Sequence, residues 1–144
     1  MSQQGLYFED LSIGQTATFA KTISEADILM FAGVSGDTNP VHLDAEYAAT
    51  TPFKERIAHG MLSAGLISAV LGTKLPGPGA IYVGQTLKFK APVRIGDTVT
   101  AKAEVIELDP EKKRVVLRTT CLIKGRTVVD GEATVMVPGR PVAV

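Results

Sequence analysis

Two side chains in the segment Ser35–His42, which reads SGDTNPVH, could perform acid–base chemistry together. Asp37 and His42 are five residues apart, and the glycine, asparagine and proline around them predict an irregular loop. A carboxylate and an imidazole on such a loop can reach one small volume, bind a water molecule there and exchange protons with it near neutral pH. Asp37 and Asn39 are also common loop and capping residues, and His42 could be a structural histidine. The spacing alone therefore leaves both interpretations open.

A second candidate for chemistry is the dipeptide His59-Gly60, which precedes a long apolar run. A glycine at a helix N-terminus leaves room for a ligand, and its N–H together with the helix dipole can stabilise negative charge on a carbonyl oxygen. The alternative is a glycine that a tight entry turn requires. We expect His59 to be a cap or packing residue rather than a second catalyst. Ser68, inside the run, either bonds back to the carbonyl one turn earlier or faces a pocket.

The run from His59 to Leu75, HGMLSAGLISAVLGTKL, is the element that must position these groups. It carries no acidic or basic side chain before Lys74, so it lacks the polar face of a surface helix. At about 15 residues it is too short to span a bilayer. We therefore predict a central helix buried on all sides, whose small residues let other backbones approach closely.

The rest of the chain supplies a sheet for that helix. Ala17–Ile23 can form a strand, Ser24 caps a short helix that ends near Gly36, and Asp44 caps another that Pro52 ends. The pattern predicts an α+β fold with the helix laid across a curved antiparallel sheet of about five strands. Because one helix cannot cover such a sheet, we expect a homodimer. After Leu75, period-two alternation marks four strand segments: Ile81–Phe89, Thr98–Leu108, Val115–Ile123 and Thr127–Val137.

Composition narrows the function classes. A chain of 144 residues fits one domain, 1–144, and its 15 basic and 15 acidic residues cancel, which gives nucleic-acid binding no electrostatic support. The single cysteine, Cys121, lies in an alternating strand pattern and is expected to be a small core residue. Two histidines without a cysteine cluster make a structural zinc site improbable. The N-terminus lacks a signal-peptide pattern, so we expect a cytoplasmic protein that does not associate with membranes.

The chain resembles the R-specific enoyl-CoA hydratases of the MaoC-like dehydratase group, which have the hot dog fold. The resemblance extends from about residue 8 to residue 137, and the G-D-x-N-P-V-H motif followed by A-H-G-M is its most specific part. The motifs that carry it are G-D-x-N-P-V-H at Gly36–His42, A-H-G-M at Ala58–Met61, L-P-G-P-G at Leu75–Gly79, G-Q-x-L-x-F at Gly84–Phe89 and P-V-x-x-G-D at Pro92–Asp97.

The resemblance implies a hydro-lyase that adds water to a trans-2-enoyl-CoA to give an (R)-3-hydroxyacyl-CoA, without a metal or organic cofactor. It implies a single hot dog domain with its core at about residues 8–137. Family members are dimers with active sites near the subunit interface. The residues carried over are Asp37 and His42 for the water, Gly60 for the thioester carbonyl, Ser68 near the active site, and Asn39 and Leu71 for substrate binding, with Leu71 lining the acyl tunnel.

Several alternatives stay open. A hot dog thioesterase shares the fold and the CoA ligand, but such enzymes usually use a carboxylate on or near the central helix, and none occurs between Gly60 and Thr73. A non-catalytic acyl-CoA-binding module would keep the fold without the reaction. The sequence leaves open the acyl chain, the physiological direction, the pathway (fatty acid oxidation or polyhydroxyalkanoate supply among others) and which of Asp37 and His42 is the acid or the base.

Overall fold

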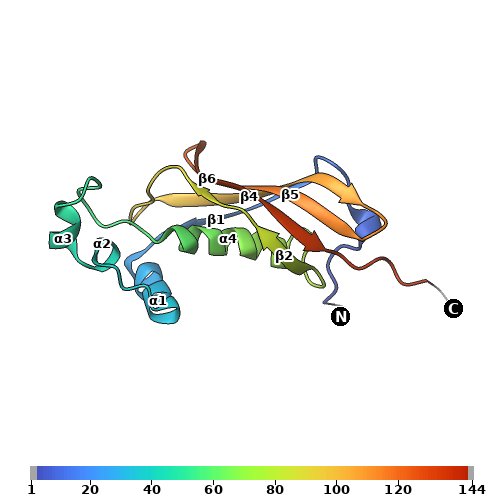
Figure 1. Ribbon diagram of the computed structural model, residues 1–144, viewed down its shortest axis with the longest axis horizontal. Coiled ribbons are helices and arrows are strands. Elements are labelled where there is room, and N and C mark those ends of the chain that lie inside the picture. The colour runs from blue at the N-terminus through green and yellow to red at the C-terminus, as the bar shows by residue number, and fades with distance from the viewer. Residues whose placement is uncertain (1–2, 143–144) are drawn as a thin grey trace.

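A computed structural model describes residues 3–142 and shows one antiparallel sheet in the order β1-β4-β5-β6-β2, with the short β3 also paired to β6 (Figure 1). The three long central strands match the alternation in the sequence: Val99, Ala101, Ala103 and Val105 all lie on the buried face of β4. The strands are β1 (Thr16–Thr22), β2 (Ile81–Gln85), β3 (Lys88–Phe89), β4 (Thr98–Asp109), β5 (Arg114–Ile123) and β6 (Arg126–Met136).

The segment predicted as one strand, Ile81–Phe89, is divided into β2 and β3. At the break the Thr86 carbonyl lies directly over Gly131 of β6, where a Cβ atom would stand 1.8 Å from the carbonyl oxygen. Only glycine permits this close approach, which interrupts the regular ladder with β6 between β2 and β3.

The central helix α4 (Gly60–Thr73) lies along one face of the sheet (Figure 1). Its inner face packs into the core through Leu66, Ile67, Val70 and Leu71. The prediction of a helix buried on all sides is wrong for a single chain, because the sheet covers only one face. The outer face is exposed and carries Met61, Gly65, Ser68 and Gly72.

Three shorter helices gather beyond the sheet, at the end where α4 begins (Figure 1). The caps predicted for the first of them are confirmed: Ser24 Oγ accepts a hydrogen bond from Asp27 N at 3.2 Å, and Gly36 ends the helix at φ 79°. The region predicted as loop contains an extra helical turn, because Asn39 caps it and Pro40 occupies its first position. These helices are α1 (Glu25–Ser35), α2 (Pro40–Leu43) and α3 (Ala45–Ala49); a 3₁₀ turn, η1, spans Phe8–Asp10.

Cys121 is fully buried in β5, as expected of a core residue, and burial raises the pKa of its thiol to about 12. Its Sγ donates to the Ser63 carbonyl of α4 at 3.5 Å, which joins sheet to helix. Among residues 3–142, no helix is long and apolar enough to cross a membrane.

Candidate active site

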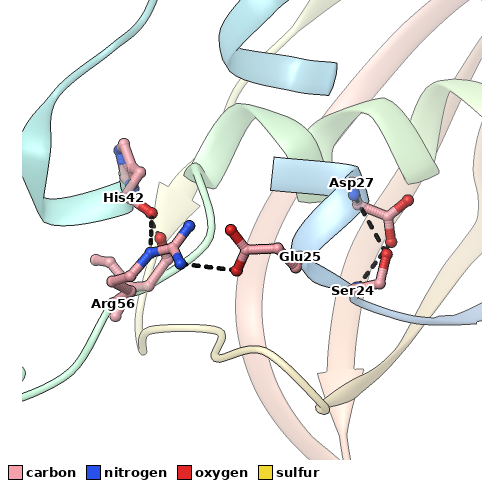
Figure 2. A network of polar contacts seen from close by, with 6 residues as sticks. Ser24, Glu25, Asp27, His42 and Arg56 are labelled. Atoms are coloured by element: carbon pink, nitrogen blue, oxygen red, sulfur yellow. Dashed lines mark hydrogen bonds and ion pairs between the residues drawn. The ribbon is translucent and has the colours of Figure 1, made fainter. Parts of the chain in front are cut away.

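His42 is fixed by contacts on both its ring and its backbone. Its Nδ1 lies 2.8 Å from the Ile57 carbonyl, and since a carbonyl can only accept, Nδ1 carries the hydrogen and Nε2 of the neutral ring is the acceptor. Arg56 Nε donates to the His42 carbonyl at 2.6 Å, and Arg56 Nη1 pairs with Glu25 of α1 at 2.7 Å (Figure 2). The neighbouring residues Arg56 and Ile57 thus set both the position and the tautomer of His42.

Asp37 follows the C-cap of α1 directly, at the mouth of the site. Its backbone N–H donates to Ser35 Oγ at 3.1 Å, and its Oδ1 accepts from Asn39 N at 3.3 Å. The side chain is exposed in the single chain. One ligand-type atom from each of Asp37, His42 and His59 lies within 4.8 Å of the others. The structure therefore brings together the acid–base pair that the spacing suggested.

His59 connects the two members of that pair. It is 2% exposed, its Nε2 donates to the Asp37 carbonyl at 2.9 Å, and its ring stacks on that of His42 with centroids 3.8 Å apart. The ring of Phe31 in α1 also packs against the His59 ring, with centroids 4.7 Å apart and the planes tilted by 49°. The expectation of a packing residue is confirmed, whereas its side chain makes no capping bond to α4. Its place at the centre of the site was missed in the sequence.

Gly60 opens α4 beside these groups, so its N–H belongs to the first turn, where backbone donors have no partner within the helix. The Phe89 ring lies over it: a Cβ on Gly60 would stand 2.6 Å from Phe89 Cε1. A side chain at this position would displace the ring, so the glycine lets Phe89 pack against the first turn of α4 in the wall of the cavity, while Gly60 itself stays exposed.

These residues line one cavity of about 360 Å³. The polar groups of Asp37, His42, His59 and Ser63 lie together around the start of α4, Lys90 adds a charged side chain just after β3, and the remainder of the wall is mostly apolar. That combination suits a ligand with one reactive polar end and a hydrocarbon portion. The lining residues include Asp37, His42, His59, Gly60, Met61, Ser63, Phe89, Pro92, Val93 and Val129.

The other residues predicted for the site do not line this cavity. Asn39 caps α2 by accepting from Val41 N at 3.1 Å, Ser68 lies on the exposed face of α4, and Leu71 is a core residue. Their proposed contacts with substrate stay predictions. The serine of α4 that does line the cavity is Ser63. It lies four residues after His59, the N-cap of α4, and this spacing of about one turn is the pattern in the sequence that indicates the same side of the helix.

The cluster of Asp37, His42 and His59 has the residue types of a metal site. His42 Nδ1 and His59 Nε2 contact the Ile57 and Asp37 carbonyls, which uses one nitrogen of each ring and is itself compatible with ion binding through the other. The two rings, however, stack on each other, whereas rings that share an ion point edge-on toward it. The residues fit water activation better than ion binding, and the expectation of metal-free chemistry stays a prediction.

A carboxylate and an imidazole beside an open helix N-terminus define an acid–base site that can also stabilise negative charge on an oxygen. A family model described as the MaoC like domain matches residues 10–126. The chain belongs to the MaoC-like family, and its fold is the hot dog fold.

Individual relatives agree with this assignment. An (R)-specific enoyl-CoA hydratase of Rhodospirillum rubrum is 70% identical, with 93% of each chain covered. A 3-hydroxybutyryl-CoA dehydratase of Methylorubrum extorquens is 59% identical, covering 92% of this chain and 85% of the relative. The unliganded R-hydratase PhaJ1 of Pseudomonas aeruginosa superposes with a TM-score of 0.89 at 50% identity, covering 98% of this chain and 97% of that one.

Proposed function

We propose that this protein is an (R)-specific enoyl-CoA hydratase, which adds water to a trans-2-enoyl-CoA to give an (R)-3-hydroxyacyl-CoA and catalyses the reverse dehydration. The observation that carries the proposal is the placement of Asp37 and His42 in one apolar cavity beside the open N-terminus of α4. The names of the relatives, an (R)-specific hydratase and a 3-hydroxybutyryl-CoA dehydratase, support it from the two directions of one reaction.

The groups divide the chemistry as follows. Asp37 and His42 hold the water and take one of its protons as its oxygen bonds to the β-carbon. The π electrons of the alkene move toward the thioester oxygen, where the Gly60 N–H stabilises the developing charge. The pair then delivers a proton to the α-carbon, which restores the carbonyl. A preorganised donor of this kind is worth about 3–4 kcal/mol in the transition state.

Crotonyl-CoA tests the proposal. Mixing it with the purified protein should remove the enoyl absorbance, and chiral analysis should find (R)-3-hydroxybutyryl-CoA. Release of free CoA instead would identify a thioesterase. If the enoyl absorbance does not fall and no CoA is released, and enoyl chains of two further lengths are also unreactive, the proposal is contradicted and a binding module is indicated.

We propose that the active form is a homodimer. β2 is an edge strand with exposed apolar side chains at Ile81 (60% exposed), Tyr82 (41%) and Val83 (45%). The exposed face of α4 carries the small residues Gly65 and Ser68. A second copy paired along β2 would extend the sheet and bury these surfaces. Light scattering should give twice the chain mass, and a monomeric mass at working concentration would contradict this.

We further propose that the enzyme is cytoplasmic. Its substrate is the acyl-CoA thioester itself, and no added cofactor takes part. Dialysis against EDTA should leave turnover unchanged. A loss of activity that zinc restores would contradict the metal-free reaction and assign the cluster of Asp37, His42 and His59 to an ion.

A further inference from the structure

Ser63 has a buried hydroxyl without a partner. The residue is 1% exposed, it lines the cavity, and Ser63 Oγ has no hydrogen-bond partner in the described part of the chain. Leaving a buried polar group unpaired is costly, and such a group calls for an explanation. The position is not needed to hold the helix, because α4 has no bond from this side chain.

Two other helical hydroxyls of this protein are satisfied in the usual way. Thr73 of α4 donates to the Ala69 carbonyl at 2.6 Å, and Ser35 of α1 donates to the Phe31 carbonyl at 2.6 Å. Both are bonds to the residue four positions earlier. Ser63 makes no such bond, so its donor is free for a group that enters the cavity.

The direction of the side chain relates it to Gly60. Side chains on an α-helix lean toward the N-terminus and cover the preceding turn. Ser63 lies three residues after Gly60, so its hydroxyl leans over the turn that Gly60 opens. The place of a Gly60 side chain is taken by the Phe89 ring, which lines the same cavity as Gly60 and Ser63. The backbone N–H and the hydroxyl therefore border the same cavity, one helical turn apart.

We propose that Ser63 is a catalytic residue whose hydroxyl donates a second hydrogen bond to the thioester carbonyl oxygen, beside the Gly60 N–H. This inference rests on the proposed hydratase function and adds a residue to it. Ser63 transfers no proton; it stabilises the charge that reaches the oxygen as water adds to the β-carbon. The thioester oxygen of the bound substrate is then the acceptor for this hydroxyl.

The test is Ser63→Ala, with Thr73→Ala as the matched control on the same helix. Removing one donor of this kind costs about 10²–10³-fold in kcat. Ser63→Ala should therefore lower kcat for crotonyl-CoA by about 10²-fold with little change in KM. Its thermal unfolding midpoint should rise, because a buried unsatisfied hydroxyl is removed. Thr73→Ala should keep the wild-type kcat.

Calorimetric binding provides a readout independent of turnover. Butyryl-CoA has the carbonyl, and S-butyl-CoA, a thioether, lacks it. Ser63→Ala should weaken binding of butyryl-CoA by about 3–10-fold, the loss of one neutral hydrogen bond, and leave the thioether unchanged. An equal loss for both ligands, a wild-type kcat, or a fall of kcat together with the unfolding midpoint would each overturn the inference. If the wild type hydrates no enoyl-CoA, the proposed function fails, and the carbonyl selectivity of binding still decides the role of Ser63.

Discussion

At the scale of the residue, the chemistry depends on a carboxylate and an imidazole whose surroundings define different tasks. The His42 ring is fixed by Ile57 and its backbone by Arg56, whereas the Asp37 carboxylate is exposed at the mouth of the cavity. The sequence pattern was sufficient to find this pair, because D-x-N-P-x-H places both on one short segment. It did not reveal that His59, 17 positions beyond His42, lies between them, since stacking is a tertiary contact.

Asp37→Asn should leave the fold intact and lower kcat by about 10²–10⁴-fold, the usual contribution of an acid–base group. The amide keeps the size and can still accept from Asn39 N, but it cannot take a proton. Steady-state hydration of crotonyl-CoA and circular dichroism measure the two effects. Ser68→Ala should cost far less, since that side chain lies on the exposed face of α4. Near-normal activity of Asp37→Asn would remove Asp37 from the mechanism.

His59 is a positioning residue, and two substitutions separate its contacts. His59→Gln can keep a donor near the Nε2 position that holds the Asp37 carbonyl, whereas His59→Phe keeps a ring to stack on His42 but loses the donor. We expect His59→Phe to lower kcat by about 10-fold or more with a smaller change in KM, because a displacement near 1 Å is costly. His59→Gln should recover part of the loss.

One result would contradict the positioning role of His59. If the two variants lose kcat equally and in proportion to their thermal unfolding midpoints, the histidine only stabilises the fold.

At the scale of the element, local sequence predicted the helix ends well and the surroundings of the helices poorly. The Ser24 cap and the Gly36 end of α1 follow from side-chain and backbone chemistry within a few residues. The burial of α4 does not, because hydropathy shows that a helix is apolar but not which face the sheet covers. The break between β2 and β3 at Thr86 likewise depends on Gly131, 45 residues away.

The capping box of α1 gives a pH prediction. The Ser24 backbone N–H, assisted by the Ser24 hydroxyl and by Lys21, holds the pKa of Asp27 below its ordinary value. The stabilisation is therefore present above the unfolded-state value of about 3.9 and is lost as pH falls through the lower folded-state value. Asp27→Asn should lower the free energy of unfolding by about 1 kcal/mol at pH 7.

Urea unfolding at several pH values measures the effect of the cap. The difference between wild type and Asp27→Asn should shrink below about pH 4. Glu107→Gln, at an exposed strand position, is the control and should show no such change. A difference that stays constant down to pH 2 would contradict the charged cap.

At the scale of the whole molecule, one end of the fold carries the chemistry and the sheet supplies the rigid support. The acid–base loop follows α1, the oxyanion donor begins α4, and the Arg56–Glu25 pair ties the two regions together (Figure 2). The family motifs identified these residues in the sequence, but only the three-dimensional structure shows how they lie in the cavity. Ser63 is the example: no motif includes it, and its place in the cavity wall and its burial without a partner come from the structure.

The central claim is that Asp37 and His42, on one wall of the cavity, handle both the water and the proton from the same face of the alkene. Hydration of crotonyl-CoA in D₂O tests this most directly, with the relative configuration of the C2 deuterium and the C3 hydroxyl determined by NMR. One-sided chemistry predicts syn addition to give the R product. Anti addition would require an acid and a base on opposite faces of the alkene and would contradict the assignment of this pair.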